Sequence, residues 1–318
     1  MGIKRKMQAL RRKFFASQCR ALNEVKKSTS VKMPENSNKA MFNFMIDFEL
    51  IWGNGKLGGV DHTIEKRISD AEKQKENFSP FLNLVEELNF PTSWAILGKL
   101  GDINSDIFIV NKFKPNWAKC NDWYSLPDNI EISSLLIDGA SYLNSIQSLK
   151  SSVEILSHGY AHIDYADQAT TLEVAKNDLE LSLEILRKYN KNSINSFVYP
   201  CNNHKFLELL TQNGINTVRG EIHEWLIKDD LIQTPLGFWI SPGAMSFKEL
   251  LPFLEKAIED KCWIHPWMHL IECDIGENDL NEFYRPLFNW CLDMEKQGKL
   301  TIVKFSELKE SLTQVKRA

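Results

Sequence analysis

The chain has 318 residues, a length at which α/β barrels commonly form a single domain. Apolar residues make up 43% of it, but no run of 18 apolar residues occurs, which excludes an apolar membrane-spanning helix. The net charge is −4; residues 1–32 hold ten Lys and Arg against one Glu, a charge of +9, so the remainder carries −13. Such an acidic body argues against nucleic acid as a partner.

The basic segment at the start of the chain is predicted to form a unit of its own. Apolar residues spaced three to four apart predict an amphipathic helix over residues 3–25, and the polar stretch 28–39 predicts a linker. Two domains follow: a basic segment over 1–39 and a globular domain over 40–318. Residues 1–32 either dock on an anionic membrane or form a solvated tail.

The expected location is the cytoplasm, at the inner face of the membrane if that segment docks there. The basic start is not followed by the apolar stretch of a signal peptide. The six cysteines are scattered and form no CxxC pair, which is typical of a reducing compartment and argues against a cysteine-rich zinc site.

From residue 40 onward, predicted strands and helices alternate along the chain. This order is typical of parallel βαβ units, and about seven repeats favour a barrel over an open sheet. No GxGxxG or GxxxxGK[ST] motif indicates a nucleotide fold. The predicted strands are 41–47, 91–98, 152–156, 194–200, 215–220, 237–241, 261–265 and 299–305, and the predicted helices are 64–89, 133–149, 170–190, 203–213, 246–260 and 279–297.

Titratable side chains lie at the ends of several of these strands. His158 and His162 are four residues apart directly after one strand, which fits either a metal-binding pair or two ordinary histidines. His265 and His269 repeat the spacing later in the chain. In α/β barrels the C-terminal ends of the strands carry the chemistry. Other predicted strands deliver Asp47, Glu49, Tyr199 and Arg219 to the same rim.

With these residues placed, the sequence from about 41 to 308 resembles the polysaccharide deacetylases, carbohydrate esterase family 4. FNFMIDFELIWG resembles the first motif of that family, in the variant with one residue between the carboxylates, and EILSHGYAH resembles its His-x-x-x-His motif. SFVYP resembles the third motif, NGINTVRG the segment before the fourth, and WIHPWMHL the fifth. The resemblance implies a distorted (β/α)7-type barrel, with the basic amphipathic helix outside it.

The resemblance also implies a metal site. Glu49, His158 and His162 would bind a divalent metal, zinc first, with cobalt, nickel or iron as alternatives. Asp47 would then be the base that accepts a proton from water. The departure from the adjacent Asp–Asp pattern of the family leaves the alternative that Asp47 binds the metal and Glu49 has another role.

Three further roles follow from the same resemblance. His265 would be the acid that protonates the leaving amine, which makes His269 structural. The backbone N–H of Tyr199 would stabilise the oxyanion. The third motif lacks its usual Arg, so Arg219 either pairs with Asp47 or forms a simple surface salt bridge.

The function implied is a metal-dependent hydrolase that removes an acetyl group from an N-acetylated sugar, a precursor in surface glycan biosynthesis. One alternative is a hydrolase of a non-sugar amide, and another is an inactive barrel that binds a glycan. Four tryptophans near the predicted rim would either stack on sugar rings or fill the core; they are Trp52, Trp123, Trp225 and Trp267.

Overall fold

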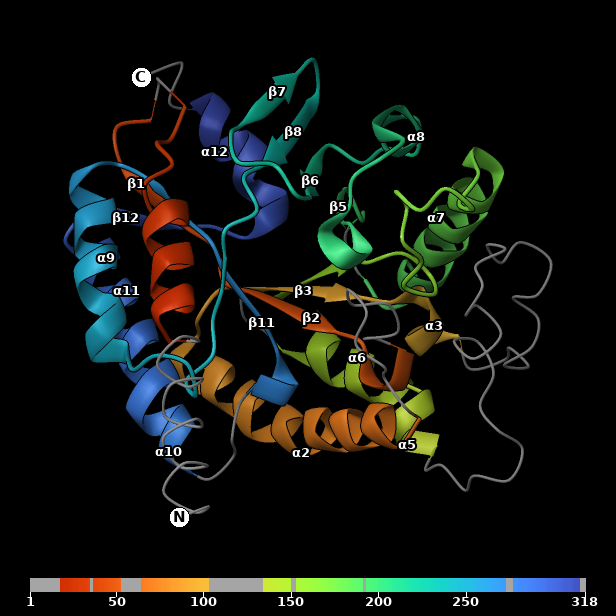
Figure 1. The fold of residues 1–318 in the computed structure, drawn as a ribbon, viewed down its shortest axis with the longest axis horizontal. Helices are drawn as coiled ribbons and strands as arrows, with labels where there is room; N and C mark the ends of the chain where they lie inside the picture. Colours follow the sequence, from red (N-terminus) through yellow and green to blue (C-terminus); the bar gives the residue numbers. More distant parts are fainter. Residues whose placement is uncertain are drawn as a thin grey trace, which may run out of the picture.

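The computed structural model describes residues 18–34, 37–52, 64–102, 134–149, 153–190, 193–272 and 277–314. Parallel strands form the centre of the molecule and helices cover it from outside (Figure 1). The strands are β1 (Ala40–Phe42), β2 (Met45–Phe48), β3 (Thr92–Ile96), β4 (Val153–Ser157), β5 (Ser196–Val198), β6 (Thr217–Arg219), β7 (Leu226–Lys228), β8 (Leu231–Thr234), β9 (Phe238–Trp239), β10 (Trp263–Ile264), β11 (Pro266–His269) and β12 (Leu300–Ile302).

The strands pair in two groups that share the same chain segments. Nine strands follow the order β7-β8-β6-β5-β4-β3-β2-β11-β9, and three follow the order β10-β1-β12. Segment β1–β2 and segment β10–β11 each pass from one group into the other, so the two groups join into one distorted barrel. Among the strands of the described residues, all pairs are parallel except the hairpin β7–β8. This agrees with the predicted (β/α)7-type barrel.

A helix follows most of the strands, as the sequence pattern predicts, but none separates β6, β7, β8 and β9. α2 runs along one side of the barrel, α9 and α11 lie near β1 and β12, and α7 lies near β5 (Figure 1). The helices of the barrel are α2 (Ile64–Leu88), α3 (Gly98–Gly101), α5 (Ser134–Ile137), α6 (Ala140–Ser148), α7 (Leu172–Leu186), α8 (Leu207–Gln212), α9 (Phe247–Glu259), α10 (Glu277–Asp279), α11 (Arg285–Lys296) and α12 (Leu308–Gln314). Within the described ranges, no helix is both long and apolar enough to cross a bilayer.

An aromatic core fixes the helices to the strands. Phe44, between β1 and β2, stacks on Phe81 of α2 and meets Phe288 of α11 edge to face, with 5.0 Å between the ring centroids of Phe44 and Phe288. All residues of β1 and β2 are buried, as expected for strands covered on both faces. At the other end of β2, next to Asp47, Phe48 packs against Phe78 and Trp94, which positions this end of the strand at the rim.

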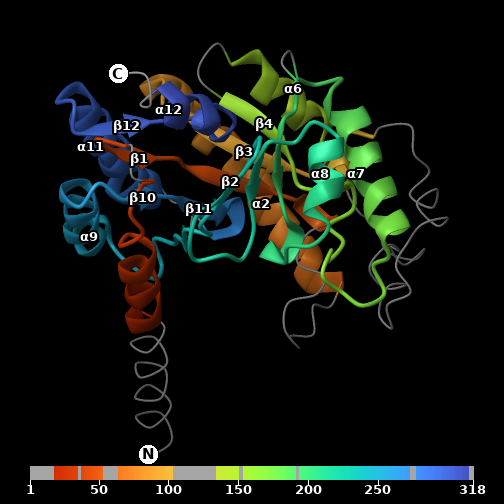
Figure 2. The same cartoon turned by 90° about the horizontal axis from the view of Figure 1, so that it is seen from above.

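The described part of the predicted N-terminal segment packs on the barrel. Residues 18–28 form a helix next to α9 and β10 (Figure 2) and bury Ala21 and Val25 in the core. In the predicted linker, Val31 accepts a backbone hydrogen bond from Trp263 at 2.9 Å. The structure therefore places residues 18–33 with the barrel, although the sequence predicts a boundary after residue 39. Residues 1–17 lie outside the described ranges.

Candidate active site

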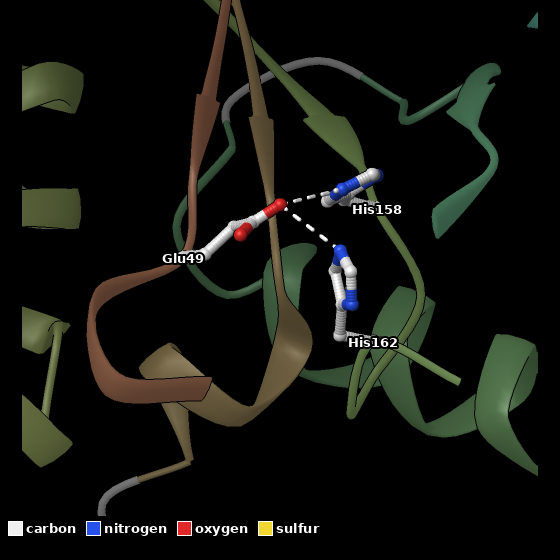
Figure 3. A group of neighbouring side chains, drawn as sticks. All are labelled: Glu49, His158 and His162. Carbon is white, nitrogen blue, oxygen red and sulfur yellow. Dashed lines mark hydrogen bonds and ion pairs between the residues drawn. The ribbon is translucent and has the colours of Figure 1, made fainter. Parts of the chain in front are cut away.

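Three of the predicted site residues converge at the rim. The Glu49 Oε1 atom lies 3.1 Å from His158 Nε2 and 3.0 Å from His162 Nε2 (Figure 3). All three side chains are buried. Bringing a carboxylate and two imidazoles together from separate strands, away from water, is unusual unless they bind a common ligand.

The local backbone explains how these three side chains meet. Glu49 follows the last residue of β2, and the chain turns at once through Leu50, which has a positive φ of 49°. His158 follows the last residue of β4. Gly159 at φ 76° and His162 at φ 55° then curl the chain so that both imidazoles face Glu49. The His-x-x-x-His spacing therefore lies on a loop and not on a helix.

The donor set fits a divalent metal ion. The ligand atoms of Glu49, His158 and His162 all lie within 4.8 Å of one another. Tetrahedral zinc with bonds of about 2.0–2.2 Å needs ligand atoms about 3.3 Å apart, close to the separations seen here. The second carboxylate oxygen of Glu49 is buried and has no hydrogen-bond partner among the described residues.

The imidazole of His158 is set in the tautomer that binds metals. Its Nδ1 atom lies 2.8 Å from the carbonyl oxygen of Val198, and a carbonyl can only accept a hydrogen bond, so Nδ1 is the donor. Nε2, which faces Glu49, is therefore the ring atom that would bind a metal through its lone pair. Burial by itself raises the pKa of Glu49, but the neighbouring His162, His269 and His158 outweigh burial and lower that pKa well below its usual range. Glu49 is thus an anion, as a carboxylate that binds a metal must be.

Asp47 lies next to this group and forms a buried ion pair with Arg219, the last residue of β6. The Arg219 guanidinium also lies 5.0 Å from the centre of the Trp267 ring. Burial by itself raises the pKa of Asp47, but Arg219, His158 and His269 outweigh burial and lower that pKa. Of the two alternatives for Arg219, the structure shows the pair with Asp47 and not a surface salt bridge.

His269 is the further histidine of this site. Its Nε2 atom lies 3.6 Å from Glu49 Oε1, and its Nδ1 atom lies 3.1 Å from Glu272 Oε1. Burial by itself lowers the pKa of His269, but the two glutamates outweigh burial and raise that pKa well above its usual range. Asp47, Glu49 and His269 form a second group whose ligand atoms lie within 4.8 Å of one another.

His265 does not line this cavity, although it lies close enough to the Asp47–Arg219 pair to interact electrostatically with both, and this corrects the assignment within the second histidine pair. His265 is fully buried between the rings of Trp263 and Phe305 and donates from Nδ1 to the carbonyl of Asn43 at 3.2 Å. Burial lowers the pKa of His265 to about 3, so its imidazole is neutral. His269, which the family resemblance makes structural, occupies the rim instead.

The backbone N–H of Tyr199 is also placed differently from the prediction. It donates to the carbonyl of Arg219 at 3.0 Å, as an extension of the β5–β6 pairing, so it is already used. The hydroxyl of Tyr199 donates to the carbonyl of Lys205 at 2.6 Å. Tyr199 contributes to the cavity wall through its buried ring and does not present a donor for an oxyanion.

A cavity of about 350 Å³ opens onto these groups, a size that suits a small molecule. Trp267 and Trp239 line it, the latter a residue that sequence reasoning missed. Trp52 is buried and Trp225 packs against the core, while Trp123 lies outside the described residues. The other side chains in the lining are Asp47, Glu49, Lys66, Asp70, His158, His162, Tyr199, Cys201, Asn202, Arg219, His269, Ile271 and Glu272.

Comparison with known proteins identifies the fold. No family model and no curated protein matches the sequence. A solved structure from Mycobacterium smegmatis assigned as a polysaccharide deacetylase matches with a TM-score of 0.58 at 12% identity, covering 90% of this chain and 94% of that one. One from Pseudomonas aeruginosa PAO1 with the same assignment gives 0.56 at 11% identity, covering 85% and 90%. The Puue allantoinase gives 0.57 at 10% identity, covering 87% and 91%.

The fold is therefore that of the polysaccharide deacetylases, a distorted (β/α)7-type barrel. At this identity the likeness concerns the fold and not the activity.

Proposed function

We propose that the protein is a metal-dependent hydrolase that removes an acetyl group from an N-acetylated sugar. The observation that carries this proposal is the convergence of Glu49, His158 and His162 at the rim, next to the Asp47–Arg219 pair and His269. A divalent metal bound by the first three residues, with zinc as our proposal, would polarise the amide carbonyl and acidify a water molecule.

Asp47 has the properties of the general base. Its Oδ2 atom is held by Arg219, while its Oδ1 atom is buried without a hydrogen-bond partner among the described residues. Arg219 keeps the carboxylate ionised and fixes its orientation. Oδ1 is therefore available to accept the proton of the attacking water.

His269 is our proposal for the general acid. It lies in the same cavity, and Glu272 holds its Nδ1 atom and favours the imidazolium form. The Nε2 atom points toward Glu49, so its proton lies close to where an amide bound at the metal ligands would break. Transfer of that proton to the amide nitrogen lets the amine leave.

The sugar substrate is proposed from the aromatic lining of the cavity. Trp239 and Trp267 offer ring faces to a sugar. The match to an allantoinase structure favours the alternative, a non-sugar amide, to a similar degree. The inactive-barrel alternative is less favoured, because the side chains that we propose as ligands, base and acid lie together at one cavity.

We further propose that the substrate is a cytoplasmic precursor of a surface glycan. Four described cysteines are free thiols, which is typical of a reducing compartment. Residues 1–17 carry six Lys and Arg and no acid, a charge that would favour an anionic membrane at its inner face.

The test combines metal analysis with two activity assays: acetate release from a panel of N-acetyl sugars, and ring opening of allantoin to allantoate. We expect close to one metal per chain and acetate release from at least one sugar. His162→Ala should lose both metal and activity, whereas His204→Ala, which changes an exposed histidine outside the ligand set, should keep both. Full metal content with no hydrolysis of any amide would favour the inactive barrel.

A further inference from the structure

A second cavity of about 460 Å³ adjoins the active site. It lies between residues 24–31, at the end of the N-terminal helix, and the barrel segment 222–239. Trp239 and Trp267 line both this cavity and the catalytic one, so the two are neighbours across the same pair of rings. We call it the helix pocket.

The walls of the helix pocket are mainly apolar. Val31 comes from the N-terminal segment, and Ile222, Leu236 and Phe238 come from the barrel segment. A concave apolar surface of this size next to a reaction centre is typical of a site that binds the unreactive part of a ligand. The walls suit an aliphatic or aromatic group better than a sugar, which would need more hydrogen-bonding side chains.

One end of the helix pocket is polar and mostly basic. Lys27 Nζ lies 3.3 Å from His223 Nε2, and both side chains are exposed. Glu24, one turn earlier, is the acidic side chain among the lining residues. Lys27 Nζ donates to His223 Nε2 in this contact, which leaves its remaining N–H groups and the Nδ1–H group of His223 as donors to one anion, such as a phosphate.

The helix pocket is preformed rather than loosely assembled. Ser28 Oγ donates to the carbonyl of Gly237 at 2.6 Å, which ties the N-terminal segment to the opposite wall. Gly237 has φ +80°, and a Cβ atom there would lie 2.1 Å from the carbonyl oxygen of His265. The wall is therefore packed tightly against His265, the residue that precedes strand β11.

Trp267 connects the helix pocket with the reaction centre. Its ring lies 5.0 Å from the Arg219 guanidinium carbon and 5.9 Å from the His269 ring, edge to face. A ligand group that contacts Trp267 in the helix pocket is thus separated by this one ring from Arg219, which pairs with the proposed base, and from the proposed acid His269.

We infer that the helix pocket binds the part of the substrate remote from the amide, and that this part is an apolar group attached to an anion. This inference rests on the proposed function, because it places the amide at Glu49, His158 and His162. The apolar group lies against Leu236 and the two tryptophans, and the anion lies at Lys27 and His223. The substrate is then an anionic amphiphile carrying an acylated amine.

The test compares three forms of whichever N-acetyl sugar is hydrolysed best: the methyl glycoside, the neutral octyl glycoside and the octyl phosphodiester. We expect kcat/KM to rise from the first to the third by at least about 10-fold. Leu236→Asp should remove this gain by placing a charge in the apolar wall, with little effect on the methyl glycoside. Lys27→Glu should remove only the advantage of the phosphodiester over the octyl glycoside.

Two further variants keep the test decisive. Ile222→Asp repeats the change at a second wall position, in case Leu236→Asp fails to fold. Leu226→Asp is the matched control, because Leu226 is 40% exposed on β7 and does not line the cavity. Equal kcat/KM for all three forms, or an equal loss for all three in the wall variants, overturns the inference.

Failure of the proposed function is distinguishable from failure of this inference. If the metal-loaded protein hydrolyses none of the sugars, binding of octyl phosphate is measured by calorimetry. A dissociation constant that rises at least about 10-fold in Leu236→Asp but not in Leu226→Asp supports the pocket even then. Absence of octyl phosphate binding, or a dissociation constant that Leu236→Asp leaves unchanged, overturns the inference.

Discussion

The sharpest prediction separates the two members of the second histidine pair. His269→Gln keeps a polar side chain of similar reach but cannot donate a proton as an acid. General-acid catalysis contributes about 10²–10⁴-fold. The other cationic side chains lining the cavity are Lys66, paired with Asp70, and Arg219, paired with Asp47. We therefore expect a loss of about 10³-fold in kcat for an N-acetyl sugar.

A substrate with a good leaving group distinguishes an acid from a structural residue. A 4-nitrophenyl ester needs no proton on its leaving oxygen, so His269→Gln should lose less than about 10-fold on it. Metal content, measured by mass spectrometry, should stay at the wild-type level. A similar loss on both substrates, or loss of the metal, would refute the acid role of His269.

His265→Leu should show the opposite pattern, with near-normal turnover and altered stability. The carbonyl of Asn43 loses its donor, which costs about 1–3 kcal/mol at pH 7.5. The folded-state pKa of His265, about 3, is below the unfolded value of about 6.5. The free energy of unfolding of the wild-type protein therefore decreases as the pH falls below 6.5, by about 2 kcal/mol at pH 5. The variant has no imidazole at this position and should not show this decrease. Urea unfolding at pH 7.5 and pH 5 measures this difference in stability. A loss of turnover in His265→Leu comparable to that expected for His269→Gln would restore His265 as the acid.

Other changes test the remaining parts of the site. Glu49→Ala and His162→Ala should each lose the metal, whereas Asp47→Asn should keep the metal and lose turnover. Metal content and acetate release, measured on each variant, test these expectations. Asp178 accepts the backbone N–H groups of Tyr160 and Ala161 at 2.9 and 3.0 Å, so Asp178→Asn should weaken metal binding about 10–100-fold in a chelator titration. Neutralising the six basic residues of 1–17 should abolish co-sedimentation with anionic vesicles; unchanged binding would contradict membrane docking.

The two histidine pairs show what sequence alone could predict. His158 directly follows an apolar strand, and its position at the rim is correct. In CWIHPWMHL the proline suggests that the strand ends at His265. The strand instead changes partner there: β10 pairs with β1, and β11 continues from Pro266 beside β2 and β9. The proline, which lacks an N–H, lies at that change, so the strand ends at His269.

Other features depend on which strands pair, which one sequence does not state. The backbone N–H of Tyr199 donates to Arg219 because β5 lies beside β6 and their pairing extends one residue beyond Val198. Arg219 reaches Asp47 from β6, whereas the segment SFVYP on β5 has no Arg. Trp239 is found at the site only because β9 pairs with β11.

The position of β1 has a consequence for how the chain is made. Phe42 on β1 pairs with Ile264 of β10 on one side and with Ile302 of β12 on the other. A ribosome adding about 5–20 residues per second needs about 13–50 s to synthesise the roughly 260 residues between Phe42 and Ile302. During that time β1 has unpaired edges that can pair with other chains. Chains that terminate before Leu300 should therefore aggregate, and a chaperone that covers β1 during translation should raise the yield of native protein.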